Sequence, residues 1–553
     1  MRRLLIVGGV AGGATAAARA RRIDEDAEIT LVERGPYVSY ANCGLPYFIA
    51  GDIQKRSKLL LQTPQGFDAR YGVKVHVNSE ALEIDRAGRR VQVRGLNGES
   101  WFDYDALVLA QGGNPIVPAL PGAEAPHVFK LWTVPDMDRL DAFITTEKPR
   151  SAVVVGGGFI GLEMAEAFRI RELDTTVVEL LPTVMSLMDR EFGVAVGREL
   201  EANGVKVVAG AGVKAVHQAD RTVELSDGRR LPAELVLFSV GVRPELALAK
   251  AAGLTLGPSG GLLVDEMLRT SDPSIWAAGD MVEVVQKVSG RKVRIPLAGP
   301  ANRQGRIAAS NAMGVVMRYG GALGTSVVKI FEATAAMTGL SERAARDAGL
   351  AVGVAVIHKD HHAGYYPGAK ELTLKLVYER PTGRLLGAQA FGHEGVEKRI
   401  DVLATALHGR MTLHDLAEID LAYAPPYSSA NDPVNLAAFI GENDLSSFSP
   451  LVTAAQLKVD LASPTPPVVI DVRTLNEFER SHVKGALHVP VDDLRFELEQ
   501  IPKGRRLAVY CRSGFRAHLA LRILRQRGFA DVANVTGGYL SMVAEGGFEL
   551  EEA

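Results

Sequence analysis

The two cysteines of the chain, Cys43 and Cys511, are its candidate sulfur nucleophiles. The sequence places no second cysteine near Cys43. A lone cysteine can cycle between a thiolate, a mixed disulfide with a small thiol and a sulfenic acid. The thiolate is the nucleophile, and a helix N-terminus or nearby positive charge lowers the thiol pKa. Gly44 and Pro46 predict that a helix opens directly after Cys43.

Cys511 stands at the end of a short apolar run, Leu507–Tyr510, and at the start of a loop. A strand that delivers a cysteine into a loop leading to a helix lets backbone N–H groups surround an anion. Such a loop depresses the thiol pKa and can cradle a persulfide. The loop residues predicted to form this cradle are Arg512, Ser513, Gly514, Phe515 and Arg516.

A glycine cluster in the middle of the first half of the chain matches a dinucleotide-binding turn. Gly156, Gly158 and Gly161 have the required spacing, and Glu179 follows 18 residues later. Glycines in such a turn let backbone N–H groups and a helix N-terminus approach a pyrophosphate, while the acid holds a ribose hydroxyl. Glu179 would repel the 2′-phosphate of NADPH, but Arg190 and Arg198 follow, so the sequence leaves use of both nucleotides open.

The N-terminus carries a looser copy of the same pattern. Gly8 and Gly13 occupy the outer positions, Val10 replaces the middle glycine, and Glu33 follows 20 residues after Gly13. Gly12 completes the candidate turn. Two copies, each flanked by apolar runs and ending in an acid, predict two βαβ folds and therefore an α/β protein.

Composition excludes several other classes of protein. Hydrophobic residues make up 47% of the 553 residues and charged residues 23%, as in ordinary globular chains. The net charge of −3 gives no reason to expect a nucleic-acid or membrane partner. No uninterrupted apolar stretch is long enough to span a membrane. Two cysteines form no disulfide framework, which favours a reducing compartment, the cytoplasm, and we assign no metal site.

The segment that ends at Asp280 links the chain to a known family. Thr270–Asp280 resembles the corresponding segment of the two-dinucleotide flavoprotein disulfide reductases, the pyridine nucleotide-disulfide oxidoreductase family. The resemblance implies that the first βαβ fold holds FAD, with Asp280 at its ribityl-phosphate region. It also implies that the second fold holds NADH or NADPH.

The surroundings of Cys43 narrow the resemblance, over about residues 1–445, to coenzyme A disulfide reductases and their NADH-dependent CoA-persulfide reductase relatives. The pattern runs Ser39-x-x-Asn42-Cys43-x-Leu45-Pro46-Tyr47. Arginines suit such a substrate because a guanidinium grips phosphate bidentately. The implied CoA contacts are Thr15, Arg19, Arg22, Ser39 and Asn42, with Asn302 as a weaker candidate.

Two tyrosine motifs farther along resemble the dimerisation domain of these reductases. Tyr365 and Tyr423 match positions that place tyrosines across the subunit interface, which implies a homodimer. A phenol near a leaving thiolate could donate a hydrogen bond or proton. Asn431 departs from the family, whose members often carry lysine there.

The last hundred residues, roughly 450–553, resemble a rhodanese domain with Cys511 as the sulfur carrier. Four residues separate Cys511 from Arg516, whereas the related cysteine phosphatases use five, so phosphatase action is disfavoured. The predicted domains are 1–115 with 245–325 for FAD, 116–244 for NAD(P)H, 326–445 for dimerisation, 446–462 as a linker and 463–553 as the rhodanese domain.

These features predict NAD(P)H-driven reduction of CoA persulfide, polysulfide or CoA disulfide through a Cys43–S–S–CoA intermediate, coupled to sulfane-sulfur handling at Cys511. One alternative is an NADH oxidase or peroxidase that uses a Cys43 sulfenic acid. Ala11 weakens it, because the peroxidase pattern has histidine there. The other alternative is a CoA-binding redox sensor that delivers sulfur to a protein partner.

Overall fold

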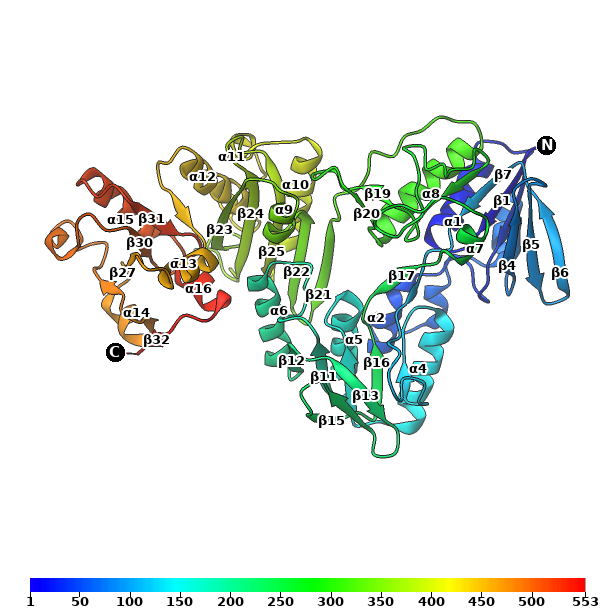
Figure 1. Cartoon of the computed structure of the whole chain (residues 1–553), viewed down its shortest axis with the longest axis horizontal. Coiled ribbons are helices and arrows are strands. Elements are labelled where there is room, and N and C mark those ends of the chain that lie inside the picture. Colours follow the sequence, from blue (N-terminus) through cyan, green and yellow to red (C-terminus); the bar gives the residue numbers. More distant parts are fainter. Residues whose placement is uncertain (553) are drawn as a thin grey trace. The chain divides into compact units, whose positions relative to one another are not determined.

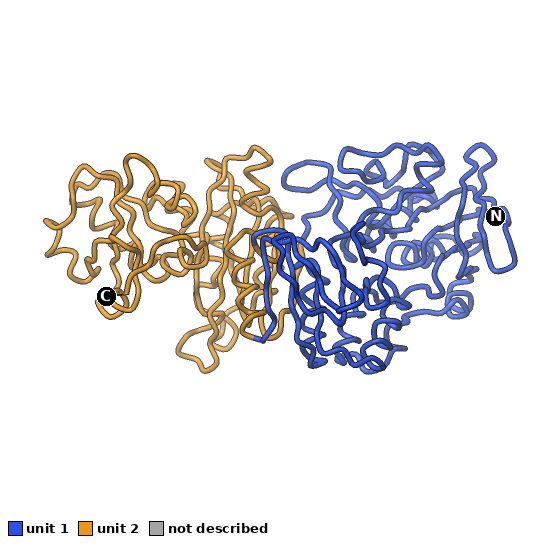
Figure 2. Tube along the Cα trace, turned by 60° about the horizontal axis from the view of Figure 1, so that its bottom comes forward, with its two compact units in different colours: residues 1–182, 203–324 blue, residues 183–202, 325–553 orange. Residues whose placement is uncertain are grey.

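Residues 1–552 are described by the computed structural model, and the chain divides into two units (Figure 2). The first unit comprises Met1–Pro182 and Asn203–Gly324, and the second comprises Thr183–Ala202 and the chain from Thr325 onward. No helix in this part of the chain combines the length and apolarity of a membrane span.

The first unit opens with a five-stranded parallel sheet in the order β18-β7-β1-β2-β3. Its strands are apolar and buried because other elements pack on the sheet, and Leu4, Leu5 and Ile6 on β1 are almost inaccessible to solvent. The shared core includes residues of α1 and α8 and also Val91 and Val93 of an antiparallel sheet in the same unit. The elements are β1 (Arg3–Val7), α1 (Ala11–Arg21), β2 (Glu28–Val32), β3 (Val73–His76), β7 (Ala106–Leu109), β18 (Ile275–Ala277) and α8 (Ala298–Ala312).

A second parallel sheet of the same unit has the order β12-β11-β10-β16-β9 (Figure 1). The glycine clusters follow β1 in the first sheet and β10 in the second, as the two βαβ patterns predict. The elements of this second sheet are β9 (Val128–Phe129), α4 (Val134–Glu147), β10 (Ser151–Val155), α5 (Phe159–Ile170), β11 (Asp174–Glu179), β12 (Lys206–Ala209) and β16 (Leu235–Phe238).

Smaller elements complete the first unit. Antiparallel three-stranded sheets are formed by β4-β5-β6 and by β13-β14-β15. Their strands are β4 (Glu80–Asp85), β5 (Arg90–Gly95), β6 (Gly98–Asp103), β13 (Val213–His217), β14 (Thr222–Leu225) and β15 (Arg230–Pro232). Two-stranded pairs join β8 (Gly113–Pro115) to β17 (Val242–Pro244) and β19 (Val284–Val285) to β20 (Lys292–Val293). The short helices are α2 (Leu45–Ala50), α3 (Pro64–Tyr71) and α7 (Ala247–Ala251).

The second unit contains an antiparallel sheet in the order β21-β22-β25-β24-β23. Its elements are α6 (Arg190–Ala202), β21 (Ser326–Ile330), β22 (Ala333–Gly339), α9 (Glu342–Asp347), β23 (Val352–Asp360), β24 (Glu371–Glu379), β25 (Leu385–Gly392), α10 (Val396–His408), α11 (Leu413–Glu418) and α12 (Pro433–Leu445). Helix α6 falls in this unit although it lies in sequence between β11 and β12 of the first.

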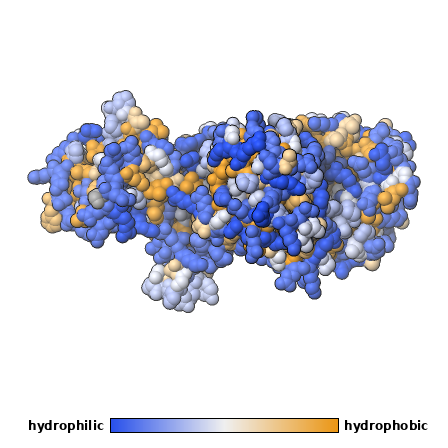
Figure 3. All heavy atoms as spheres, turned by 90° about the horizontal axis from the view of Figure 1, so that it is seen from below, coloured by the Kyte–Doolittle hydropathy of each residue, from blue (hydrophilic) through white to orange (hydrophobic). Residues whose placement is uncertain are grey.

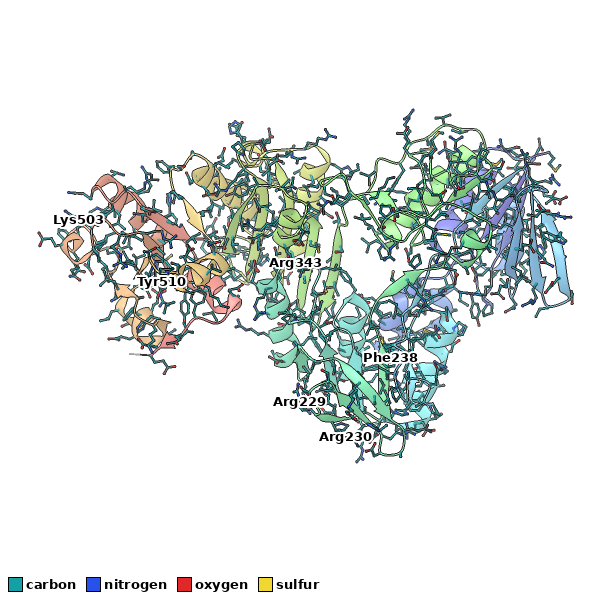
Figure 4. The ribbon with its side chains drawn as sticks, viewed as in Figure 1. Arg229, Arg230, Phe238, Arg343, Lys503 and Tyr510 are labelled. Atoms are coloured by element: carbon teal, nitrogen blue, oxygen red, sulfur yellow. The ribbon has the colours of Figure 1, made fainter. Side chains whose placement is uncertain are left out.

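Packing explains the position of α6. Lys375 on β24 is 3% exposed and contacts Asp189 at 2.9 Å, Glu191 at 2.6 Å and Glu342 at 2.9 Å. Asp189 precedes α6, Glu191 lies in its first turn, and Glu342 begins α9. A guanidinium nitrogen of Arg343, which Figure 4 labels, donates to the carbonyl of Ser186 at 2.6 Å. Buried ionic contacts therefore bind α6 to the antiparallel sheet.

The C-terminal part of the second unit is a parallel sheet in the order β26-β31-β30-β27-β29. Its elements are β26 (Leu451–Val452), α13 (Ala454–Leu461), β27 (Val468–Asp471), α14 (Leu475–Arg480), β29 (Leu487–His488), β30 (Leu507–Tyr510), α15 (Phe515–Gln526), β31 (Val532–Val535) and α16 (Gly538–Glu545). Thus the segment 446–462, predicted as a linker, contains β26 and α13, and β26 pairs with β31.

The predicted α/β class is confirmed: two parallel nucleotide-type sheets are followed by an antiparallel sheet and a parallel C-terminal sheet. On the face shown in Figure 3, hydrophobic residues (orange) occur in scattered groups among hydrophilic ones (blue). The exposed large side chains of the second unit include Tyr365, Tyr366, Tyr423 and Tyr427.

Candidate functional site

The turn after β1 has a backbone that only glycine can form without strain. Gly8 has φ +101°, and a Cβ there would lie 2.3 Å from the carbonyl oxygen of Ala110. A Cβ on Gly13 would lie 1.7 Å from the oxygen of Gly8. At Gly12, by contrast, a Cβ would meet its nearest atom at 3.6 Å. The outer glycines thus allow the backbone of the turn to pack against β7 and α1.

Acidic and amide side chains gather at the carboxyl ends of the strands in this first sheet. The carboxylate of Glu33, just after β2, accepts N–H groups from Gly9 and Gly35, each at 2.7 Å. Burial raises the pKa of Glu33 and raises that of Asp280, after β18, to about 6. The side-chain oxygen of Gln111, after β7, is buried and has no hydrogen-bond partner within residues 1–552. This edge of a parallel sheet is where such folds bind ligands.

The turn after β10 repeats the geometry of the first. A Cβ on Gly156 would lie 2.3 Å from the oxygen of Ser239, and one on Gly161 would lie 2.0 Å from the oxygen of Gly156. Gly158 precedes α5, and a Cβ there would meet nothing within 4 Å, which leaves its face of the turn open. The carboxylate of Glu179 accepts the N–H of Gly157 at 2.8 Å, as Glu33 does in the first sheet. The unit therefore carries two equivalent dinucleotide cradles.

Cys43 occupies a short 3-10 turn, Asn42–Gly44, and α2 begins directly after it. The predicted helix after Cys43 is therefore confirmed, with Pro46 in its first turn. The side-chain oxygen of Asn42 accepts the backbone N–H of Cys43 at 3.1 Å and lies 3.7 Å from its Sγ. Cys43 keeps exposed surface, as an attacking sulfur requires.

The electrostatic surroundings of Cys43 differ from the positive environment that activates many thiols. The protein atoms packed around the sulfur raise its pKa, and the charges of Glu163 and Asp280 raise it further. Glu163 comes from α5, beside the second glycine turn, and Asp280 follows β18 of the first sheet. Cys43 therefore lies where residues of both nucleotide folds meet.

Tyr47 connects this cysteine segment to α5. The Tyr47 hydroxyl donates a hydrogen bond to Oε1 of Glu163 at 3.0 Å. Burial raises the pKa of Glu163 to about 7, although the Tyr47 hydrogen bond opposes the shift. Sequence reasoning missed Glu163, and the available signal was a carboxylate within the otherwise apolar stretch Phe159–Met164.

Replacing Glu163 by glutamine is expected to lower the apparent pKa of the Cys43 thiol by up to about one pH unit. The carboxylate disfavours the thiolate, so a neutral amide leaves more thiolate at any given pH. The pH dependence of Cys43 alkylation by iodoacetamide in the reduced holoenzyme measures the midpoint. The control is Glu172→Gln, an exposed position just beyond α5. An unchanged or higher midpoint in the Glu163 variant would contradict the assignment.

Several residues predicted to contact CoA lie on α1 and α8, which pack together. The hydroxyl of Thr15 donates to the side-chain oxygen of Asn302 at 2.9 Å, so the structure brings these two together. The Nε of Arg19 donates to the Ser310 hydroxyl at 2.9 Å. Arg22, at the end of α1, is exposed and its Nε donates to the carbonyl of Ala18.

Ser39 and Asn42 lie in the segment that leads to Cys43. Ser39 adopts a left-handed backbone conformation, with φ 47°, and its N–H donates to the carbonyl of Gly9 at 2.8 Å. The carbonyl of Ser39 accepts the N–H of Leu61. These backbone hydrogen bonds attach the segment before Cys43 to the first glycine turn.

Tyr365 and Tyr423 form a hydrogen-bonded pair in the second unit. Their hydroxyl oxygens lie 3.1 Å apart, and the residues are 77% and 47% exposed. Tyr366 and Tyr427 are also exposed. Tyrosines are enriched at interfaces because they bury a large ring and keep a polar group hydrogen-bonded.

Cys511 is buried at the end of β30, directly after Tyr510, which Figure 4 labels. The N–H of Gly514 points at its Sγ, with a nitrogen–sulfur distance of 3.1 Å. Gly514 has φ +110°, a conformation that glycine adopts readily. The far end of the loop is held by Arg516, whose guanidinium binds Glu477 at 2.6 and 2.7 Å and lowers the pKa of that carboxyl to about 2. A backbone N–H of the loop is therefore directed at the sulfur, an arrangement typical of anion-binding loops.

Comparison with protein families finds a match for each of three consecutive segments of the chain. Residues 2–305 match the family described as pyridine nucleotide-disulphide oxidoreductase, and 325–433 match the dimerisation domain of that family. The chain belongs to this oxidoreductase family. Residues 453–545 match the rhodanese-like domain, so the oxidoreductase is fused to a rhodanese domain.

Two solved structures match nearly the whole chain, and a curated relative matches most of it. The chain is 41% identical to reduced CoADR-RHD of Bacillus anthracis, with a TM-score of 0.95 and 98% of each chain covered. It is 37% identical to an NAD-dependent persulfide reductase from A. fulgidus, with a TM-score of 0.90, over 97% of this chain and 99% of the other. An NAD(P)H sulfur oxidoreductase (CoA-dependent) of Pyrococcus abyssi is 35% identical over 79% of this chain and 97% of its own.

The family implies FAD and NAD(P)H as cofactors, and the two cradles fit them. The first cradle offers the open face of Gly12, the unpartnered Gln111 oxygen and the acids Glu33 and Asp280. The second offers Gly158 and Glu179 at the start of α5 and the end of β11. The chain is thus a flavin- and pyridine nucleotide-dependent oxidoreductase with a rhodanese domain.

Proposed function

We propose that this oxidoreductase reduces CoA persulfide, polysulfide or CoA disulfide through a single cysteine, Cys43. The observation that carries the proposal is the position of Cys43, which is the one cysteine of its unit. It lies near Glu163 of the second nucleotide fold and Asp280 of the first. The printed names of the relatives, which include a CoA-dependent sulfur oxidoreductase and a persulfide reductase, support the substrate class.

In the proposed reaction the Cys43 thiolate attacks the CoA-bound sulfur of CoA persulfide. A Cys43–S–S–CoA bond forms and hydrosulfide leaves; with CoA disulfide the leaving group is CoA thiolate. FAD, when bound in the first cradle, would supply this sulfur centre with two electrons received from NAD(P)H. With one proton they cleave the mixed disulfide to Cys43 thiolate and CoA, so sulfur and electrons balance over the cycle.

The CoA contacts are proposed at Thr15, Arg19, Arg22, Ser39, Asn42 and Asn302. The Thr15–Asn302 hydrogen bond supports a common site on α1 and α8, and the exposed Arg22 suits a phosphate group. Asn42 already contacts the cysteine through its side-chain oxygen. We place the nucleotide portion of CoA on the arginines and its thiol end at Asn42.

The working form is proposed to be a homodimer in the cytoplasm. The match to a dimerisation domain and the exposed tyrosines support a dimer. By family resemblance, Tyr365 and Tyr423 would assist the departing thiolate of the other subunit with a hydrogen bond or proton. Their mutual hydrogen bond leaves one phenol proton free to be donated.

NADH is the proposed electron donor in preference to NADPH. The Glu179 carboxylate faces its own glycine turn and would repel a 2′-phosphate. Arg190 and Arg198, which could have offset that repulsion, donate instead to the carbonyls of Glu545 and Val543 at the end of α16. We expect kcat/KM for NADH to exceed that for NADPH.

The test is a substrate panel with the purified holoenzyme. NADH oxidation is followed anaerobically with CoA persulfide and CoA disulfide, anaerobically with hydrogen peroxide, and in air without another acceptor. Faster turnover with a CoA–sulfur species is the expected result. Faster turnover with peroxide or oxygen would favour the oxidase or peroxidase alternative, and slow turnover with saturable CoA binding would favour the redox sensor.

The rhodanese domain is proposed to exchange sulfane sulfur at Cys511, with a CoA persulfide or a sulfur-donor protein as its partner. The Gly514 N–H directed at the sulfur and the closed loop support this role. Because the oxidoreductase and the rhodanese domain belong to one chain, we propose that the two cysteines act on the same sulfur substrate in succession.

A further inference from the structure

The rhodanese domain packs on one face of the antiparallel sheet, next to the Cys511 loop. Because side chains alternate along a strand, Glu371, Thr373 and Lys375 of β24 share a face, and His358 of β23 lies opposite Thr373. His358 contacts the hydroxyl of Ser541 on α16 at 3.1 Å. At the edge strand, the hydroxyl of Thr536 accepts the N–H of Val356 at 2.8 Å.

The same face reaches the Cys511 loop through an ion pair. The guanidinium of Arg512, the residue after Cys511, donates to both carboxylate oxygens of Glu371 at 2.7 and 3.3 Å. The two side chains are 50% and 37% exposed, so the pair lies at the surface beside the loop. Within residues 1–552, the side chains of the loop contact one carboxylate from outside the rhodanese domain, and that carboxylate is Glu371.

The ion pairs leave the loop without net positive charge from its side chains. Arg512 is matched by Glu371, and Arg516 is matched by Glu477. His358, beside the first pair, adds no charge because burial lowers its pKa to about 4. The Gly514 N–H favours an anion at the sulfur, and Arg516 interacts with Cys511 while it is paired with Glu477.

Two classes of sulfur donor differ in the charge that they bring to such a loop. Thiosulfate is a small dianion whose charge lies next to the sulfur to be transferred, so it depends on a cation at the loop. A thiol persulfide carries at most one charge there, which backbone N–H groups can accommodate. A carboxylate that neutralises a loop guanidinium therefore penalises the dianion more than the persulfide.

We propose that Glu371 is a specificity-determining residue of the rhodanese site. By pairing with Arg512 it makes Cys511 discriminate against thiosulfate and accept sulfane sulfur from persulfides of thiols. The inference rests on the proposed sulfur exchange at Cys511. It means that Glu371, a residue of the antiparallel sheet, affects which sulfur donor the rhodanese site accepts.

The transfer balances without an added oxidant. The Cys511 thiolate attacks the terminal sulfur of RS–SH, the RS–S bond breaks, and the products are RSH and a Cys511 persulfide. With thiosulfate the same attack releases sulfite. Cyanide then removes the outer sulfur as thiocyanate and regenerates the Cys511 thiolate, so one acceptor serves both donors.

The experiment compares thiosulfate with glutathione persulfide as donors to the full-length holoenzyme, with cyanide as acceptor. The native enzyme is expected to prefer the persulfide. In Glu371→Gln, kcat/KM for thiosulfate should rise roughly tenfold while that for the persulfide changes less than about twofold. Adding Arg512→Gln to that variant should remove the gain, because the freed guanidinium causes it.

Matched controls separate this effect from a general disturbance. Glu379→Gln, on the same strand but paired with Arg384 at 3.2 Å, should leave the donor ratio unchanged. NADH-linked reduction of CoA disulfide, measured in every variant, reports the proposed function separately, because Glu371 takes no part in it. An unchanged donor ratio in Glu371→Gln, or a native enzyme that uses thiosulfate as efficiently as the persulfide, would overturn the proposal.

Discussion

Replacing Cys43 by serine is expected to lower NADH-linked reduction of CoA persulfide and CoA disulfide by at least roughly a thousandfold. Serine is nearly isosteric, but its hydroxyl does not ionise near neutral pH and cannot form the mixed disulfide. No neighbouring thiol can substitute, because the other cysteine, Cys511, belongs to the rhodanese domain. Anaerobic steady-state kinetics with each CoA–sulfur substrate measure the loss.

The matched control is the other cysteine. Cys511→Ser should retain CoA disulfide reduction within about twofold, because the rhodanese loop takes no part in that step, and should lose sulfane-sulfur transfer to cyanide. Flavin content and the reduction of bound FAD by NADH should be unchanged in both variants. If Cys43→Ser kept full NADH-linked thiol production, the single-cysteine mechanism would be wrong.

Replacing Lys375 by methionine is expected to cost about 3–5 kcal/mol of stability. The ammonium group is 3% exposed and contacts three carboxylates. Asp189 and Glu191 would lose their counter-charge, whereas Glu342 would keep its ion pair with Arg346 at 2.8 Å. Burial disfavours ionisation of Asp189 and Glu342, yet Lys375 holds the pKa of both below the usual value. Urea unfolding measures the loss, and amide hydrogen exchange should locate it in β24 and α6.

The stability loss caused by Lys375→Met is expected to depend on pH. Without Lys375 the carboxyl groups favour their protonated form, so the deficit should shrink as the pH falls from 8 to 5. Lys206→Met is the control, because Lys206 pairs with Asp174 at the surface, where an ion pair contributes at most about 1 kcal/mol. A Lys375→Met protein as stable as the native one at pH 8 would contradict a binding role for this cluster.

The sequence predicts those features of the fold that depend on local patterns. Gly8, Gly13, Gly156 and Gly161 stand where a Cβ would collide with backbone oxygen, so their spacing alone indicates both turns. The apolar runs before each turn predict buried parallel strands. The helix after Cys43 follows from the proline in its first turn.

Features that depend on contacts distant in sequence could not be predicted in this way. Glu163 lies 120 residues from Cys43, and only the packing of α2 against α5 brings its charge to the thiol. Because burial and the charges of Glu163 and Asp280 disfavour the thiolate, the pKa of Cys43 is raised despite the helix that follows. Glu371 meets Arg512 across 141 positions. No short motif encodes such pairs.

The measurement that tests the central claim most directly is the mass of the enzyme after exposure to CoA disulfide without NADH. We predict one CoA per chain, attached at Cys43 in a non-reducing peptide digest and released as free thiol when NADH is added anaerobically. A chain that gains no CoA, or that carries it on Cys511 while Cys43 remains unmodified, would contradict the account.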